Sequence, residues 1–502
     1  MNDHLIVGYE SASADTEIKQ VVLNLKRANR HGLIAGATGT GKTVTMQALA
    51  ESFANVGVPV LLADVKGDVS GISQAGKTHP KINERLVKLG LPTDAWCGCP
   101  TIFWDLHGKA GHPIRATISD MGPLLIARLL GLNDTQEGIL NIAFAVADDQ
   151  GLLLLDLKDL RSMLNHLSEH SSELRSLYGN ISASSVGAIQ RRLLVLDRGG
   201  AKAFFGEPML ELADLMQTDT DGRGFISVLV ADKLMENPAV YSTMLLWLLS
   251  ELFEELPEVG DPEKPKLVLF FDEAHLLFKD TPTALVDKIE QVVRLIRSKG
   301  VGVYFVTQSP ADLPDRVLAQ LGNRFQHALR AYTPREQQAV KVAAQTFRSD
   351  GSFSVTEVIS QLGVGEALVS TLQPDGSPSF VRATKIKPPL SRLGPATRPE
   401  RAGVMAVSPI MGKYDEAIDR ESAFEKLKAR AENAADEAER AKQEQTRPSP
   451  KAEPERTAAK PKKTSSRQGV GEAFIKSVMR TVGNGIGRSL VRGILGSLFK
   501  GR

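Results

Sequence analysis

Residues 36–43 read GATGTGKT and place three glycines ahead of a lysine and a threonine. The spacing fits the pattern G-x-x-x-x-G-K-[ST], in which a glycine loop leads into the amino end of a helix. Backbone N–H groups of such a loop and the helix dipole stabilise a polyphosphate. Lys42 is able to reach the β- and γ-phosphates, and the Thr43 hydroxyl is a suitable ligand for Mg²⁺.

The flanking residues supply the strand and the helix that this chemistry needs, which argues against a chance match in a glycine-rich turn. Residues 31–35 (HGLIA) are typical of a short buried strand, and residues 44–55 (VTMQALAESFAN) are typical of a helix that Gly57 closes. The residues predicted to bind ATP are Gly36, Ala37, Thr38, Gly39, Thr40, Gly41, Lys42, Thr43 and Val44.

A second cluster of chemical groups lies far downstream, in the stretch KLVLFFDEAH at 266–275. Its apolar run predicts a central strand that helices cover on both faces, and the run ends in two acids. Asp272 would hold Mg²⁺, and Glu273 would act as the general base that polarises the attacking water. A buried strand that merely ends in two acids is the alternative, but the upstream glycine loop favours a catalytic role.

Polar residues also follow two further predicted strands. The strand at 301–307 is followed by Gln308, which we expect to sense the γ-phosphate or to orient water. The carboxyl ends of parallel strands converge on ligand sites, so the position suits that role. The strand at 59–64 leads into Asp64, Lys66 and Asp68, whose role is left open between a ligand site and a solvated turn.

Four arginines are candidates for a residue that reaches the ATP of a neighbouring subunit. Such an arginine finger places positive charge where the transition state gathers negative charge, which is worth about 10³–10⁵ in rate. We expect the role to fall on Arg324 or Arg330, with Arg294 and Arg297 as further candidates. For each residue taken singly, a surface salt bridge is the competing interpretation.

Composition limits the class of protein. The 502 residues carry a net charge of +2, so any nucleic-acid surface must be a local patch. The only two cysteines are Cys97 and Cys99, which excludes a disulfide framework and favours a cytoplasmic location. No signal peptide is evident, and no apolar run reaches the length of about 18 residues that suggests a transmembrane helix.

Hydrophobic patterning predicts an α/β fold with a mainly parallel sheet that a helical insertion interrupts. We place the first half of an ATPase core, with the glycine loop, at 1–119 and the helical insertion at 120–222. The second half of the core, with both acids and Gln308, occupies 223–395. We further expect residues 114–118 to pair as a strand with residues 101–105.

The remainder of the chain changes character. Residues 396–468 are predicted to form an extension and a disordered linker rich in proline, lysine, alanine and serine. Residues 469–502 read as a basic amphipathic tail, in which six basic residues accompany the single acid Glu472. Such a tail suggests a membrane surface, an acidic partner or nucleic acid, and a helix docked on the protein itself is the alternative.

The motifs GATGTGKT, LLADVKGD, LFFDEAH, RLIRSKGVGVYFVTQSP and QLGNRFQHALRAYTPREQQAV together resemble those of the HerA/FtsK superfamily of hexameric P-loop ATPases. Within it, the chain resembles the bacterial HerA-like helicases of the YjgR type over residues 20–395 and on to 411–414. The resemblance implies a RecA-like (ASCE) core, a ring of six subunits and ATP-driven translocation of DNA.

The resemblance implies roles for residues at matching positions: Lys42 and Thr43 bind nucleotide and metal, Asp272 supports Mg²⁺, Glu273 is the general base and Gln308 is the γ-phosphate sensor. The chain departs from the family pattern in one respect. HerA proper carries a β-barrel ahead of the ATPase core, whereas only 35 residues precede Gly36, so we expect that barrel to be absent here.

Three functions follow as hypotheses. The first is an ATP-hydrolysing DNA translocase or helicase-like motor that acts as a homo-hexamer. The second is a membrane-peripheral ATPase that secretes or assembles a protein substrate, with residues 469–502 as its anchor. The third is a nucleotide-gated scaffold with negligible turnover, which the complete set of Lys42, Asp272 and Glu273 argues against.

Overall fold

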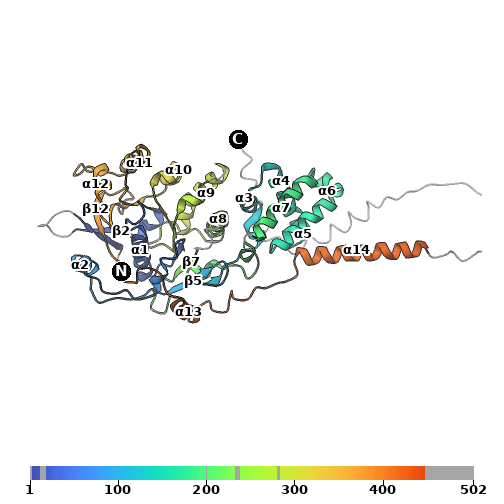
Figure 1. The fold of residues 1–502 in the computed structure, drawn as a ribbon, viewed down its shortest axis with the longest axis horizontal. Helices are drawn as coiled ribbons and strands as arrows, with labels where there is room; N and C mark the ends of the chain where they lie inside the picture. The colour runs from blue at the N-terminus through green and yellow to red at the C-terminus, as the bar shows by residue number, and fades with distance from the viewer. Residues whose placement is uncertain (1–2, 12–18, 199–200, 232–237, 280–282, 447–502) are drawn as a thin grey trace, which may run out of the picture. The chain divides into compact units, whose positions relative to one another are not determined.

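The computed structural model describes residues 3–11, 19–198, 201–231, 238–279 and 283–446 (Figure 1). The predicted linker beyond residue 446 and the basic tail at 469–502 lie outside the described residues. One compact unit spans Met1–Asp436 and contains the sheet together with helices α1 to α13. In the described part of the chain, no helix combines the length and the apolar character needed to cross a bilayer.

A 12-stranded sheet of the described residues forms the centre of this unit, in the order β2-β1-β12-β11-β10-β3-β9-β8-β4-β7-β5-β6. Neighbouring strands from β10 to β6 are parallel, and the pairs between β2 and β10 are antiparallel. The parallel strands are β3 (Gly32–Ala35), β4 (Val60–Asp64), β5 (Thr101–Asp105), β6 (His112–Pro113), β7 (Ile226–Val230), β8 (Leu267–Phe271), β9 (Val301–Thr307) and β10 (Asn323–His327). The antiparallel strands are β1 (His4–Glu10), β2 (Gln20–Asn24), β11 (Glu366–Ser370) and β12 (Arg382–Ile386).

Helices cover both faces of the parallel strands. Along β8, Val268 and Phe270 pack into the core that α1 shares, whereas Leu269 and Phe271 pack into the core that α8 and α9 share. A strand buried on both faces needs an uninterrupted apolar run, which explains the sequence LVLFF. The helices outside the insertion are α1 (Lys42–Asn55), α2 (Pro80–Lys88), α8 (Pro238–Glu255), α9 (Thr283–Ile296), α10 (Asp315–Leu318), α11 (Pro334–Gln345), α12 (Val355–Gln361), α13 (Arg398–Ala406) and α14 (Ala423–Thr446).

A helical bundle is inserted between β6 and β7 (Figure 1). Its helices pack on one another, and α3 also packs on α8 of the core, so that one apolar cluster runs through both parts. The bundle consists of α3 (Ile118–Leu129), α4 (Asp134–Asp149), α5 (Leu157–Glu169), α6 (Ser171–Tyr178) and α7 (Ala183–Arg198). The predicted α/β class, with a mainly parallel sheet and a helical insertion, is confirmed.

Two details of the strand prediction need correction. Residues 114–118 do not form a strand. The strand that pairs with β5 is instead the two-residue β6 at His112–Pro113, and α3 already begins at Ile118. Strand β1 was not expected. It is held between β2 and β12, and its pairing with β12 joins residues 8–10 to residues 384–386.

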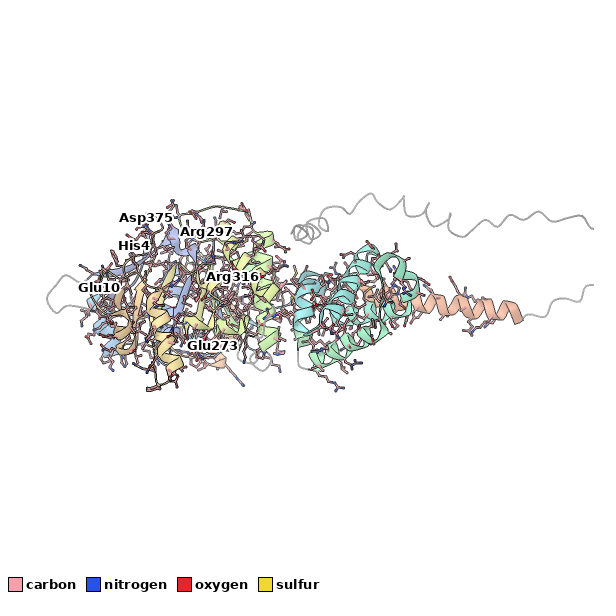
Figure 2. All side chains as sticks on the ribbon, turned by 90° about the horizontal axis from the view of Figure 1, so that it is seen from above. His4, Glu10, Glu273, Arg297, Arg316 and Asp375 are labelled. Carbon is pink, nitrogen blue, oxygen red and sulfur yellow. The ribbon has the colours of Figure 1, made fainter. Side chains whose placement is uncertain are left out.

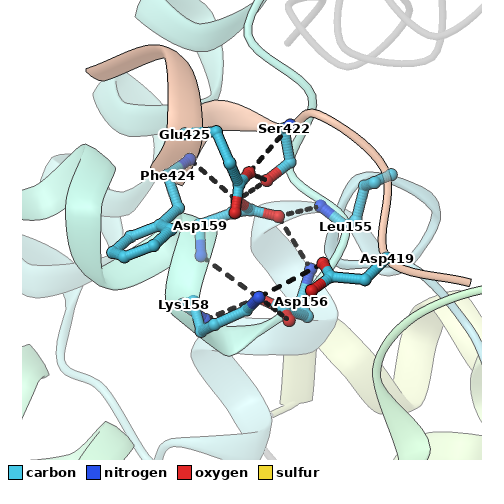
Figure 3. A network of polar contacts seen from close by, with 8 residues as sticks. All are labelled: Leu155, Asp156, Lys158, Asp159, Asp419, Ser422, Phe424 and Glu425. Atoms are coloured by element: carbon cyan, nitrogen blue, oxygen red, sulfur yellow. Dashed lines mark hydrogen bonds and ion pairs between the residues drawn. The ribbon is translucent and has the colours of Figure 1, made fainter. Parts of the chain in front are cut away.

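Residues 407–422 connect α13 to α14, and the end of this segment docks on the bundle together with the first turn of α14. Figure 3 shows the Asp159 carboxylate of α5 accepting hydrogen bonds from both Ser422 and the Phe424 N–H, the latter at 2.9 Å. The same carboxylate accepts the N–H of Leu155 at 2.8 Å and caps the start of α5. Asp159 is 1% exposed, so each of its acceptor positions needs a donor. The segment is therefore part of the compact unit that ends at Asp436. The division of this unit at residue 395 stays a prediction.

Tyr414 anchors the same segment on the core. Its buried ring packs edge-on against Trp104 of β5, with 5.3 Å between the ring centroids. Its hydroxyl donates to the Asp214 carboxylate and accepts the N–H of Glu211 at 3.0 Å. Lys413 beside it forms ion pairs of 2.7 Å with both acids.

We expect Tyr414→Ala to lower the free energy of unfolding by about 3–5 kcal/mol, because it removes a buried ring and leaves a cavity. Tyr414→Phe keeps the ring and removes one donor to Asp214, so a loss of about 1–2 kcal/mol is expected. Denaturant unfolding measures both values. Tyr332→Ala is the matched control, since Tyr332 is 86% exposed and its loss should change stability by less than about 0.5 kcal/mol. Equal stability of Tyr414→Ala and wild type would contradict the anchoring role.

Candidate active site

The glycine loop joins β3 to α1 with a backbone that side chains would hinder. Gly39 and Gly41 adopt φ of 78° and 112°, in the region that favours glycine. A Cβ at Gly41 would lie 3.0 Å from the N–H nitrogen of Gly365, which itself donates to the Thr40 carbonyl at 3.0 Å. The loop that precedes β11 therefore forms one wall of the glycine loop. Because α1 begins at Lys42, the N–H groups of its first turn have no partners within the helix.

Lys42 is buried and folds back onto its own loop. Its Nζ donates to the carbonyl oxygens of Gly36 at 2.6 Å and of Ala37 at 3.1 Å. Burial and, secondly, the charge of Lys66 lower the pKa of Lys42, while Glu273 and Asp272 act in the opposite direction. A buried ammonium group whose charge is poorly compensated gains stability from an anion. The site thus fits the negative charge of a polyphosphate.

Two acids stand at the carboxyl end of β8. Asp272 accepts the N–H of Glu273 at 2.9 Å through Oδ1, and Tyr241 donates to its backbone carbonyl at 2.9 Å. Burial raises the pKa of Asp272 to about 6, against the opposing charge of Lys66. A hard divalent cation would compensate a buried carboxylate of this kind, so the oxygen ligands present fit Mg²⁺.

Glu273 has a strained backbone and an incompletely satisfied side chain. Its φ of 48° lies in the left-handed region, which is uncommon for a residue other than glycine. Lys66 Nζ lies 3.0 Å from Oε1, whereas Oε2 is buried without a hydrogen-bond donor in the described structure. His275 Nδ1 lies 3.4 Å from Oε2, which is within ion-pair distance. A carboxylate oxygen that receives no hydrogen bond is suited to accept a proton from water.

Strand β9 brings the two clusters to one edge of the sheet. It pairs in parallel with β3 on one side and with β8 on the other, in the registers Ala35 with Thr307 and Phe271 with Phe305. The glycine loop and the acids both follow the carboxyl ends of these strands, and the charges of Asp272 and Glu273 act on Lys42. Lys42, Asp272 and Glu273 are therefore neighbours despite their distance in sequence.

The other predicted site residues lie at the same edge. Gln308 follows the last residue of β9 directly and is exposed between the glycine loop and the acids. Thr43 is the second residue of α1 and is partly exposed, as is Val44 after it. All three residues are therefore at least partly exposed to solvent.

The candidate arginines occupy different places. Arg324 lies near the amino end of β10 and donates to the carbonyl oxygens of Leu318, Leu321 and Thr346 within its own chain. Arg330 lies past the carboxyl end of β10, is exposed, and donates to the Ser360 carbonyl at 2.6 Å.

The two arginines of the stretch that precedes β9 also differ. Arg294 is exposed on α9, and Arg297 lies 4.0 Å from Asp261. Figure 2 shows Arg297 and Glu273 on opposite sides of the core, as expected for residues that precede β9 and follow β8 in a parallel sheet. Within a single chain, Arg297 is therefore remote from the acids.

Sequence reasoning missed one residue of the site, His327. The His327 Nε2 lies 2.9 Å from the Thr45 hydroxyl of α1. A Cβ added at Gly36 would lie 2.5 Å from the Cβ of His327, so the ring packs directly against the glycine loop. Burial lowers the pKa of His327 to about 4, so the ring is neutral near pH 7. The only available signal was a polar residue at the end of the strand that adjoins β3.

Comparison with known proteins places the chain in a family. The family model described as "Helicase HerA-like C-terminal" matches residues 10–502. The chain belongs to this HerA-like family. The DNA double-strand break repair helicase HerA of Saccharolobus solfataricus is 21% identical over 358 residues, which cover 70% of this chain and 63% of the relative. HerA of Sulfurisphaera tokodaii is 23% identical over 369 residues, which cover 71% of this chain and 64% of the relative.

The HerA-like chain thus spans less than two thirds of the length of these relatives. Among solved structures, VirB4 of Thermoanaerobacter pseudethanolicus aligns with a TM-score of 0.50 and 16% identity, over 77% of this chain and 97% of that chain. This likeness concerns the fold alone. It agrees with the RecA-like arrangement of a HerA-like protein, in which β9 separates the strand before the glycine loop from the strand that carries the acids.

Proposed function

We propose that this HerA-like chain is an ATP-hydrolysing motor that translocates DNA and works as a homo-hexameric ring in the cytoplasm. The observation that carries the proposal is the meeting of a buried lysine and two buried acids at one edge of the sheet, on either side of β9. Binding of a triphosphate alone would need the lysine and the glycine loop. The adjacent pair Asp272–Glu273 adds the groups that hydrolysis needs.

In this mechanism residues 36–44 hold the triphosphate through backbone N–H groups, and the Lys42 ammonium group leaves the carbonyls of Gly36 and Ala37 for the β- and γ-phosphates. The Thr43 hydroxyl and the Asp272 carboxylate would hold Mg²⁺, which would supply positive charge to offset the negative charge of the phosphate oxygens. Glu273 takes the proton of the attacking water through Oε2, which receives no hydrogen bond in the described structure. Gln308 orients that water from the adjoining strand end.

An arginine from the neighbouring subunit completes the proposed site. Arg330 suits the role better than Arg324, because it is exposed at the sheet edge that carries the glycine loop. Arg324 is committed to three carbonyl oxygens of its own chain, and burial lowers its pKa. Release of Arg330 requires the loss of two hydrogen bonds, to the carbonyl oxygens of Ser360 at 2.6 Å and of Leu362 at 3.4 Å. The first is solvent-exposed and the second is long, so both are inexpensive to break.

The test is the rate of ATP hydrolysis by the full chain, with and without single- and double-stranded DNA, over a range of protein concentrations. We expect DNA to stimulate turnover at low salt and the rate per subunit to rise cooperatively with concentration as rings form. Turnover that neither DNA type changes at any salt concentration would contradict a DNA motor. A rate per subunit that stays independent of concentration, with monomers in sedimentation, would contradict the ring.

A second candidate rests on the basic amphipathic sequence at 469–502. A peripheral ATPase that acts on a protein substrate would use this segment to bind an anionic membrane surface. Flotation with vesicles rich in anionic lipid, comparing the full chain with one truncated after residue 468, separates the two functions. Flotation that depends on the tail, together with turnover insensitive to DNA, would favour the second candidate.

A further inference from the structure

Lys66 contacts the proposed catalytic base from a neighbouring strand. It follows β4 by two residues, and β4 pairs in parallel with β8 in the register Ala63 with Phe271. The Lys66 Nζ lies 3.0 Å from Glu273 Oε1, and the two side chains are 41% and 10% exposed. The lysine thus reaches from the solvent side to a nearly buried carboxylate.

The direction of this contact matters. In the strand order β3-β9-β8-β4, Lys66 comes from the side of β8 that faces away from β9 and the glycine loop. The ion pair therefore holds Oε1 of Glu273 on a residue that enters from β4, and this restricts how the carboxylate can turn toward a water on the β3 side.

The surrounding charges stabilise the ion pair between Lys66 and Glu273. Burial works to lower the pKa of Lys66, but Asp272, Glu273 and Asp68 together outweigh it and raise that pKa. Lys66 also repels Lys42, as its lowering effect on the pKa of Lys42 indicates. A bound triphosphate attracts both ammonium groups, so it competes with Glu273 for Lys66.

We propose that Lys66 is a positioning residue that holds the Glu273 carboxylate in an inactive orientation, and that opening of this ion pair precedes hydrolysis. The inference rests on the proposed role of Glu273 as the base. It adds a regulatory role to the stretch DVKGD, which the sequence left open between a ligand site and a solvated turn. A motor with such a restraint hydrolyses little ATP until its substrate is engaged.

The test compares steady-state ATP hydrolysis by the full-length wild type, Lys66→Met and Lys66→Arg, without DNA and with saturating DNA. We expect Lys66→Met to raise the DNA-independent kcat by about three- to tenfold at unchanged KM for ATP, because the restraining pair is gone. The ratio of DNA-stimulated to basal turnover should fall by the same factor. Lys66→Arg should restore a low basal rate, since a guanidinium group can still pair with Glu273.

Lys88→Met is the matched control, because Lys88 is also 41% exposed and forms an ion pair of 2.9 Å with Glu84 outside the site. It should leave both rates unchanged. A basal kcat of Lys66→Met that is equal to or lower than that of an active wild type would overturn the inference while leaving the proposed function intact. A wild type that hydrolyses no ATP under any of these conditions would refute the proposed function and the inference together.

Discussion

Glu273→Gln is expected to reduce the turnover of ATP by about 10²–10⁴-fold, the usual contribution of a general base. The amide has nearly the same shape as the carboxylate but cannot accept the proton of the attacking water. Glu273 lies beside Asp272 and near Lys42, and its Oε2 has no hydrogen-bond donor in the described structure. Single-turnover hydrolysis at saturating ATP measures the loss directly, because it separates the chemical step from product release.

Binding of the nucleotide should survive this substitution, since the glycine loop and Lys42 are unchanged. Equilibrium binding of a fluorescent ATP analogue checks this point. Glu84→Gln serves as the control, because the Glu84 side chain is 65% exposed and lies outside the site. Undiminished hydrolysis by Glu273→Gln would remove the proposed base and, with it, the mechanism.

Lys42→Met is expected to abolish productive binding of the triphosphate and to lower turnover by about 10²–10³-fold, as for the loss of one preorganised charge-stabilising group. The Lys42 ammonium group is buried, and burial together with the charge of Lys66 lowers its pKa. A bound anion would stabilise this ammonium group. Methionine fills a similar volume without the charge. The two hydrogen bonds from Nζ to the carbonyls of Gly36 and Ala37 are lost as well.

Thermal unfolding with and without magnesium and ATP reports on this effect without requiring turnover. At a nucleotide concentration of about 100 times Kd, binding stabilises the folded wild type by about 2.7 kcal/mol. Lys42→Met should show almost none of this gain, while its stability without nucleotide should stay close to that of wild type. A gain equal to that of wild type would show that the triphosphate does not bind at Lys42.

Local patterns were sufficient to predict the centre of the molecule. The glycine loop, the apolar strands and the acids that follow β8 depend on neighbours within a few residues, and the periodicity of α9 is visible in the sequence alone. The parallel order of the strands then brings the strand ends together. Gln308 could be located for the same reason, because it directly follows the buried strand β9.

Contacts between distant residues could not be predicted in this way. The pairing of β1 with β12, the burial of Tyr414 against Trp104 and the docking of Ser422 on Asp159 each join positions hundreds of residues apart. No local property of Ser422 distinguishes it from a residue in an exposed linker. The contact of Lys66 with Glu273 belongs to this group too, since a lysine in a charged turn points outward in most proteins.

The close approach of Gly365 to Gly41 links the antiparallel end of the sheet to the nucleotide site. Gly365 has a φ of 73°, and a Cβ there would lie 2.6 Å from Nη1 of Arg85, which donates to the Gly365 carbonyl. A side chain at Gly365 would therefore strain the backbone and displace the guanidinium group of Arg85. Substitutions in the short turn between α12 and β11 should register as changes in ATP affinity, and a screen for such variants would find them in a segment that carries none of the catalytic groups.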